Sequence, residues 1–384
     1  MPQRIDVGAK LTGQAGRYDI GVLQVRTGEM NDLAGEDLSV LRLRRRLFQQ
    51  SYIGALYTRR SRRISDDVDR HTAGVDAELQ TSHFRGSQNL ALSGFYVWTS
   101  QPDAAGDGAG YGLRLSYPND PFSAELAVRE LQPNYDPAVG FVERRGYKRL
   151  NPSIEYTPRL RNHPFIRGFE FSLDFDILND SENRPLTREL EFTPLEINFE
   201  DGSQFGIDVV PTYERLEEDF EISDGIVLPE GEKYQFTRIQ IGGGTADHRV
   251  VSVESDVTFG NFFSGRRREY SIEIGVRPRR GMALALEAEH NVLELAEGTF
   301  DATVYRARAN TQLSPWISVV NNVQYDSVSD LVGWQMRFRW IRRPGNDFYF
   351  VYTHNWREAH DDRGSRFTTL DNRAAAKVLY TVRF

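Results

Sequence analysis

Apolar and polar residues alternate strictly along much of this chain. From Phe169 to Ile177 the sequence reads FEFSLDFDI, in which every second residue is apolar. Since successive side chains of a β-strand leave opposite faces, this period of two is typical of a strand with one apolar and one polar face. About 21 segments of about 8 to 12 residues follow the pattern, and no segment has a convincing helical period. The sequence therefore predicts an all-β protein.

The length of these segments separates two kinds of all-β fold. Strands of soluble proteins usually have about 5 to 6 residues, whereas about 9 to 11 tilted residues cross a bilayer. Short connections, such as residues 118–122, alternate with longer polar stretches, such as residues 132–147 and 357–373. Outer-membrane barrels have short periplasmic turns and long external loops. We predict a large antiparallel transmembrane β-barrel of the outer-membrane type, with about 20–22 strands in the full protein; the alternative is a soluble β-sandwich, propeller or β-helix.

The two ends of the chain suggest that an N-terminal part is missing. The first segment, residues 4–12, ends at a short turn, and the last, residues 372–384, follows a long stretch. Both should end on the periplasmic side, which gives an odd number of strands, whereas a closed bacterial barrel needs an even number. The first ten residues, MPQRIDVGAK, do not resemble a signal peptide. We expect a single outer-membrane β-barrel domain over residues 1–384 that lacks a signal peptide and at least one strand; a miscounted segment is the alternative.

The C-terminal sequence KVLYTVRF indicates how the protein is assembled. It ends in Phe384, with Val382 and Tyr380 at alternating positions before it. This pattern resembles the signal by which the barrel-assembly machinery recognises outer-membrane proteins. The alternative is an ordinary last strand that ends in phenylalanine.

Composition narrows the classes further. No run of 18 apolar residues occurs and the mean hydropathy is −0.52, which excludes membrane-spanning helices. Aromatic residues make up 12% of the chain, too many for a disordered protein. There is no cysteine, and the seven histidines are scattered without metal-ligand spacing. The net charge of −8 argues against nucleic acid as a partner. We expect no catalytic residue, no cofactor and no metal.

Charged residues occupy many of the alternating polar positions. An arginine at the midplane of a bilayer costs about 2–4 kcal/mol, so these residues must face water or one another. The candidates for a charged lumen are Arg42, Arg44, Arg46, Asp76, Glu78, Glu125, Glu170, Asp174, Asp176, Glu254, Asp256, Arg337 and Arg339. They form either a network of cross-strand ion pairs that stiffens the wall, or a polar lumen or docking surface for a plug. Basic runs at residues 59–63 and 266–268 either pair with lipopolysaccharide phosphates or are solvated.

Several motifs resemble those of one protein family. They are VGAKLTGQAGRYDIGVLQVRTGE near the start, SYIGALYTRR, GNFFSGRRREY, and above all VQYDSVSDLVGWQMRFRWIRRPGNDFYFVYTHNW at residues 323–356. This chain resembles an uncharacterised bacterial outer-membrane β-barrel family, a domain of unknown function that normally follows an N-terminal carbohydrate-binding family 9-like domain. The resemblance extends over essentially the whole chain and implies a barrel. We expect the carbohydrate-binding-like domain to be absent here.

These observations predict a non-enzymatic protein of the outer membrane of a Gram-negative bacterium. It would act as a pore or translocation channel, or as a membrane anchor for an associated periplasmic or surface domain. The alternative is a carbohydrate-active protein of the cell envelope that binds or hydrolyses glycans. Expected partners are outer-membrane lipid, lipopolysaccharide and the barrel-assembly machinery, with either an oligosaccharide or a plug or periplasmic protein in addition.

Overall fold

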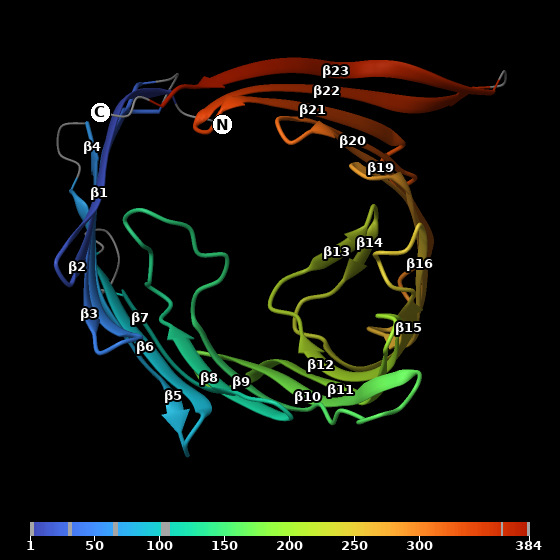
Figure 1. The fold of residues 1–384 in the computed structure, drawn as a ribbon, viewed down its shortest axis with the longest axis horizontal. Helices are drawn as coiled ribbons and strands as arrows, with labels where there is room; N and C mark the ends of the chain where they lie inside the picture. Colours follow the sequence, from blue (N-terminus) through green and yellow to red (C-terminus); the bar gives the residue numbers. More distant parts are fainter. Residues whose placement is uncertain (1–3, 30–32, 64–67, 101–107, 362–363, 382–384) are drawn as a thin grey trace. The chain divides into compact units, whose positions relative to one another are not determined.

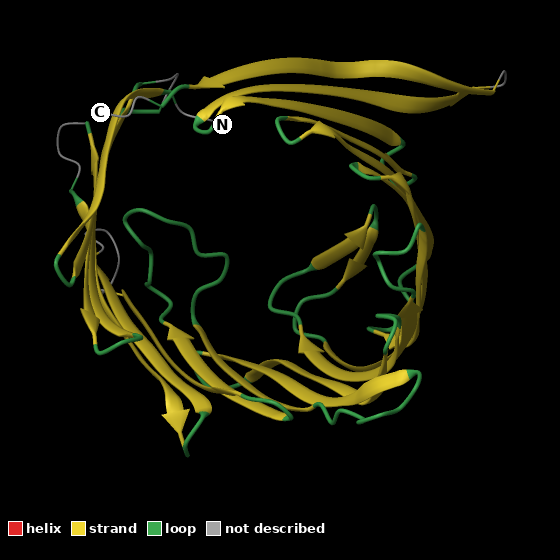
Figure 2. Ribbon diagram, in the orientation of Figure 1, coloured by secondary structure: helices red, strands yellow, loops and turns green. Residues whose placement is uncertain are grey.

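The protein has an all-β fold, as predicted. The computed structural model describes residues 4–29, 33–63, 68–100, 108–361 and 364–381 (Figure 1). Strands account for nearly all of the regular structure in these residues, as the yellow arrows of Figure 2 show. They form one 21-stranded antiparallel sheet and a separate two-stranded hairpin. Strands of the large sheet have between 10 and 16 residues, the length expected of membrane-crossing strands.

From β1 to β9, and again from β15 to β23, each strand of the large sheet pairs with the next strand along the chain. The first twelve are β1 (Ile5–Ala15), β2 (Tyr18–Thr27), β3 (Glu36–Leu47), β4 (Ser51–Arg62), β5 (Arg70–Phe84), β6 (Gln88–Ser100), β7 (Gly108–Pro118), β8 (Phe122–Leu131), β9 (Tyr147–Tyr156), β10 (Ile166–Asp180), β11 (Pro185–Phe199) and β12 (Gln204–Arg215). The others are β13 (Phe220–Ser223), β14 (Ile226–Leu228), β15 (Lys233–Gly244), β16 (Val251–Phe262), β17 (Gly265–Arg279), β18 (Met282–Glu294), β19 (Thr299–Ser314), β20 (Ile317–Asp326), β21 (Leu331–Arg343), β22 (Asn346–Asp361) and β23 (Gly364–Leu379).

The chain divides into two compact units. Unit 1 comprises Met1–Thr157, Ser172–Glu191 and Thr212–Glu217, and unit 2 comprises Pro158–Phe171, Phe192–Pro211 and Glu218–Phe384. Strands β1 to β9 therefore belong to unit 1 and β13 to β23 to unit 2, and β10, β11 and β12 each contribute a part to both.

The pairing register of unit 1 gives its sheet two chemically different faces. Tyr57, Ala73 and Trp98 lie opposite one another on β4, β5 and β6, and belong to an apolar face. Glu78, Ser93 and Arg114 lie opposite one another on the other, polar face of β5, β6 and β7. Large apolar side chains exposed on the apolar face include Leu41, Leu43, Ile53, Tyr57, Val75, Leu79, Leu92, Tyr96, Trp98, Tyr111, Leu113, Leu115, Leu126, Val128 and Ile154.

Unit 2 has the same two faces. Val253, Ile274 and Leu286 lie opposite one another on β16, β17 and β18, and each side chain is exposed. On the other face Glu254, Glu273 and Glu287 form the matching row. A register slip of one residue would exchange the two faces, so the alternation in the sequence fixes the register of each pair.

The prediction for the C-terminal region is wrong in one respect. Residues 357–373 were expected to form a long loop, but β22 and β23 pair through most of this stretch, for example at Trp356 and Thr369. Phe367, Thr368 and Thr369 favour a strand because aromatic and β-branched residues fit a pleated surface. The last strand therefore begins at Gly364 rather than near residue 372, and it ends at Leu379. Tyr380 follows the strand, and Val382 and Phe384 lie outside the described residues.

Candidate functional site

Ion pairs link the predicted charged residues across the polar face of unit 1. The Arg42 guanidinium donates two hydrogen bonds to the Asp76 carboxylate, one of them with 2.8 Å between Nη2 and Oδ2. Glu125 accepts a hydrogen bond of 2.6 Å from Arg114. These carboxylates and guanidiniums come from β3, β5, β7 and β8, so the pairs cross between strands.

The remaining candidates of unit 1 lie on either side of these pairs. Arg44 donates to Asp19 at 3.1 Å and lies over the Tyr52 ring, and Arg46 is 3.7 Å from Asp19. Asp176 accepts two hydrogen bonds, of 2.8 and 2.7 Å, from Arg149. Asp174 lies two residues before Asp176 on the same face of β10.

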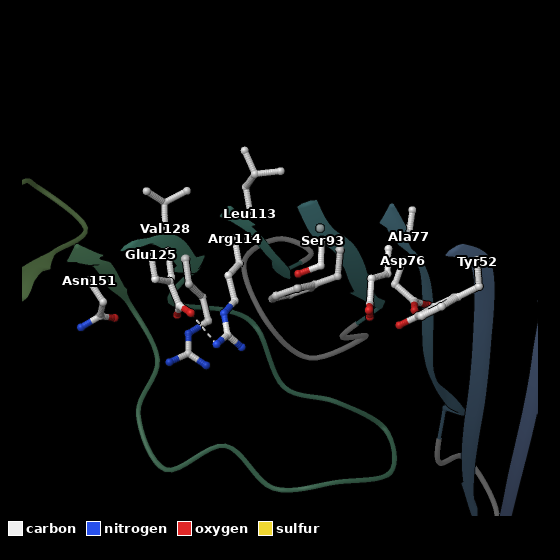
Figure 3. A pocket seen from close by; sticks show the side chains of 15 residues that line it. Tyr52, Asp76, Ala77, Ser93, Leu113, Arg114, Glu125, Val128 and Asn151 are labelled. Atoms are coloured by element: carbon white, nitrogen blue, oxygen red, sulfur yellow. Dashed lines mark hydrogen bonds and ion pairs between the residues drawn. The ribbon is translucent and has the colours of Figure 1, made fainter. Parts of the chain in front are cut away.

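A hollow of 580 Å³ opens on this polar face between β4 and β9. It is lined by Tyr52, Asp76, Ala77, Glu78, Ser93, Gly94, Phe95, Gly112, Leu113, Arg114, Glu125, Ala127, Val128, Arg129 and Asn151. In Figure 3 the polar side chains of Asp76, Arg114 and Glu125 extend to one side of the strands, whereas Leu113 and Val128 extend to the other. The hollow is therefore a feature of the polar side of the sheet.

Two glycines leave room for side chains that cross the polar face of unit 1. A Cβ atom on Gly54 would lie 2.6 Å from Nη2 of Arg42 and 2.8 Å from Oδ1 of Asp76. A Cβ atom on Gly112 would lie 2.8 Å from the ring of Phe95. The missing side chains leave room for the Arg42–Asp76 pair to pass over β4 and for the Phe95 ring to pass over β7.

The unit 2 candidates lie among charged residues that were not among the predicted site residues. Glu273 and Glu287 accept hydrogen bonds from Arg308 and Arg306, respectively. Glu254 lies opposite Glu273. The alternation in VYRARAN, residues 304–310, is the signal that would have identified the two arginines. The row therefore has three glutamates, and the two arginines of β19 pair with two of them.

The other unit 2 candidates are spread over several strands. Asp256 packs against Gly242, where a Cβ atom would lie 2.0 Å from its Oδ1. Arg339 is 3.4 Å from Asp347. Arg337 makes no ion pair with any described residue, and Glu170 lies on β10, in the part that belongs to unit 2. The structure does not gather these four residues into one cluster.

Most arginines of the predicted basic runs are paired within the protein. Arg59 pairs with Asp69 at 2.5 Å, and Arg60 pairs with Glu36 at 2.6 Å. In the second run Arg268 pairs with Glu294. These three arginines therefore pair with carboxylates of the same chain.

The long loop of unit 1, residues 132–146, lies against the polar face of its sheet (Figure 1). The amide of Ala138 donates to Thr72 Oγ1 at 2.8 Å, and Thr72 shares the polar face of β5 with Asp76. Arg70 pairs with Asp136 at 2.8 Å, and Ala138 is buried. Burial raises the pKa of the Tyr135 phenol in the same loop. The loop is thus bound to the sheet rather than extended away from it.

The corresponding loop of unit 2 contains the hairpin β13–β14. Phe220 of the hairpin contacts Phe263, with 6.0 Å between ring centroids. Phe263 also contacts Tyr234 and Phe236, at 5.2 and 5.3 Å. Tyr234 and Phe236 share the polar face of β15 with Gly242, which lies opposite Asp256. Leu228 is fully buried. An aromatic cluster therefore holds the hairpin on the polar face of unit 2.

The described part of the chain contains no group of three or more histidine, aspartate or glutamate side chains placed to hold a metal ion. None of its helices is both long and apolar enough to cross a membrane.

The fold is similar to that of solved import receptors, at low sequence identity. The ferric-catecholate import receptor Fiu from E. coli K12 is 10% identical, with a TM-score of 0.47 over 98% of this chain and 74% of that chain. The ferric yersiniabactin uptake receptor FyuA from Yersinia pestis is 12% identical, with a TM-score of 0.43 over 96% of this chain and 68% of that one. No family model matches this chain, and no curated protein does. Membership of the uncharacterised barrel family therefore stays a prediction.

Proposed function

We propose that this chain is an outer-membrane β-barrel protein of a Gram-negative bacterium whose polar face lines a passage for small polar solutes. The observation that carries the proposal is the exposure of large apolar side chains along one face of long strands. Val75, Leu113 and Tyr96 are 56%, 52% and 49% exposed. A contiguous apolar face of this kind marks a membrane or protein contact, and lipid hydrocarbon would cover it.

The backbone supports the same proposal. In hydrocarbon each amide and carbonyl must be hydrogen-bonded within the protein, so only helices and closed sheets cross a membrane. The long strands pair with their neighbours over most of their length, as β17 does with β16 and β18. A strand of 10 residues rises about 33 Å, enough to cross the hydrocarbon core at a tilt.

The polar face supports a passage rather than a packed interior. Closure of about 21 strands leaves a lumen too wide for side chains alone to fill. The ion pairs on the polar face are half-exposed; for example, the side chains of Arg42 and Asp76 are 34% and 23% exposed. In this proposal the loop at residues 132–146 and the hairpin β13–β14 narrow the lumen, since each is bound to the polar face of its own unit.

The first experiment tests the membrane part of the proposal. The purified chain should fold only in detergent or lipid and should migrate differently on gels before and after boiling. A chain that folds in plain buffer would contradict the proposal. The second experiment tests the passage by planar-bilayer recording, in which discrete conductance steps are expected.

A folded, inserted protein without conductance would contradict the passage and favour a membrane anchor for an associated periplasmic or surface domain. Glycan release by the purified protein, abolished by a single acid substitution, would instead favour the carbohydrate-active alternative. Contacts with outer-membrane lipid, lipopolysaccharide and the barrel-assembly machinery belong to the same proposal.

A further inference from the structure

We propose that the hollow on the polar face of unit 1 binds a short peptide with free termini, whose ammonium group lies at Glu78 and whose carboxylate lies at Arg129. This inference rests on the proposed passage and names a class of solute for it. Its basis is the distribution of charge inside the hollow.

Most of the charges that line the hollow are already matched. Asp76 accepts hydrogen bonds from Arg42 and Tyr52. Glu125 accepts one from Arg114. These groups form neutral pairs, so their net attraction for a charged ligand is small.

Two charges of opposite sign remain. Among the described residues, Glu78 and Arg129 take part in no hydrogen bond or ion pair between side chains. Glu78 interacts with Arg114, and Arg129 with Asp176, through longer-range electrostatics alone, and the Arg129 guanidinium lies over the Tyr147 ring, 5.9 Å from its centroid. Glu78 is on β5 and Arg129 on β8, so they lie at different ends of the hollow. The hollow therefore has an acidic end and a basic end.

A zwitterion matches this arrangement better than other ligands of similar size. A purely anionic ligand would be repelled by the Glu78 carboxylate, and a purely cationic ligand would be repelled by the Arg129 guanidinium. A neutral polyol would offer neither residue a counter-charge. Electrostatic complementarity of this kind selects the ligand and its orientation.

The size of the hollow suits a di- or tripeptide. Three strand spacings, about 14 Å, separate the backbones of β5 and β8. The side chains of Glu78 and Arg129 occupy part of this distance, so the ligand spans the remainder. An extended peptide spans about 3.5 Å per residue. The volume of 580 Å³ lies in the range typical of small-ligand sites. Phe95 lies between the two ends and offers an apolar surface for the peptide side chains.

The experiment uses the folded chain in detergent micelles and isothermal titration calorimetry with trialanine. Three further probes are N-acetyl-trialanine, trialanine amide and the doubly blocked peptide. Loss of either terminal charge should weaken binding about tenfold, the usual effect of a charge-assisted hydrogen bond. In Glu78→Gln, N-acetylation should no longer matter while amidation still does. In Arg129→Gln the reverse should hold.

Controls and contrary outcomes complete the test. Glu155→Gln and Arg85→Gln change the same two residue types outside the hollow and should bind as the wild type does. Heat-modifiable migration verifies that each variant is folded. Equal binding of all four probes, or no binding of any probe by folded protein, would overturn the inference. Because binding is measured in micelles, its failure is distinct from an absence of conductance in bilayers, which would contradict the passage alone.

Discussion

The guanidinium of Arg42 on β3 reaches the carboxylate of Asp76 on β5 by passing over Gly54 on the intervening strand β4. A pair of this geometry joins strands that are not hydrogen-bonded to each other. It depends on the absence of a side chain between them, and both partners are only half-exposed, so solvent screens the pair incompletely. The Arg42–Asp76 pair therefore links β3 to β5 across the polar face of unit 1.

The first prediction concerns this crossing point. Gly54→Val should displace the Arg42–Asp76 pair, because a Cβ atom at this position would lie 2.6 Å from Arg42 Nη2. We expect destabilisation of about 1–3 kcal/mol, as for other overpacked sites. Urea unfolding followed by gel mobility measures it. Gly13→Val is the control, since a Cβ atom at Gly13 would meet nothing within 4 Å; equal loss of stability in both variants would contradict the prediction.

The second prediction concerns the turn between β10 and β11. The Asp180 carboxylate accepts hydrogen bonds from the Arg184 amide at 2.8 Å, from Arg184 Nε at 2.6 Å and from Arg215 Nη2 at 2.8 Å. Asp180→Ala would leave these donors without an acceptor, so cleavage of the turn by an added protease should accelerate about tenfold. Glu182→Gln alters an exposed side chain of the same turn and should change little. A turn that is equally resistant in both variants would show that Asp180 does not order it.

The third prediction concerns the docking of the β13–β14 hairpin. Phe263→Ala should free the hairpin, because Phe263 contacts Phe220, Tyr234 and Phe236. We expect a loss of about 2 kcal/mol of local stability, seen as faster hydrogen exchange over residues 220–228. Phe48→Ala is a matched control: Phe48 also lies in a turn with positive φ, but its side chain is 88% exposed. Unchanged exchange in Phe263→Ala would mean that the aromatic cluster does not hold the hairpin.

The fourth prediction concerns pH at the turn between β11 and β12. A hydrogen bond from the Ser203 amide, together with the Ser203 hydroxyl and Arg249, lowers the pKa of Asp201. A carboxyl whose pKa is lower in the folded state stabilises the fold above its unfolded pKa of about 3.9, and this contribution disappears as the pH falls through the folded value. At pH 7, hydrogen exchange at residues 200–204 should be faster in Asp201→Asn than in the wild type. The difference should shrink as the pH is lowered below the unfolded pKa of about 3.9, and a difference that did not change with pH would contradict the assigned cause. Asp224→Asn, in the turn of the β13–β14 hairpin, should match the wild type at residues 200–204 throughout.

Much of the fold could be predicted because β-strands report their two faces directly in the sequence. The alternation in segments such as residues 169–177 marked the strands, and short stretches such as residues 118–122 proved to be turns between them. The C-terminal hairpin was missed because the polar residues around Phe367 and Thr369 hid a strand that pairing with β22 stabilises.

The candidate site could be predicted only in part. Alternation places Arg42, Asp76 and Glu125 on a polar face, but it does not say which charges meet. Arg114 and Arg149, the partners of Glu125 and Asp176, were not singled out, because each is the one arginine of its strand and belongs to no alternating run of arginines. The site residues Tyr52 and Phe95 were also missed as lining residues, since an aromatic residue at a strand position is equally consistent with the apolar face.

The sequence by itself determined that this protein is built of long two-faced strands, because the side-chain period of a strand is independent of what surrounds it. Only the tertiary structure decided which charges cancel and which remain. That outcome depends on the register between neighbouring strands and on glycines such as Gly54, which let side chains from separate strands meet. Glu78 and Arg129 stand out in the hollow for this reason alone: the residues around them are paired, and pairing is a property of the folded sheet.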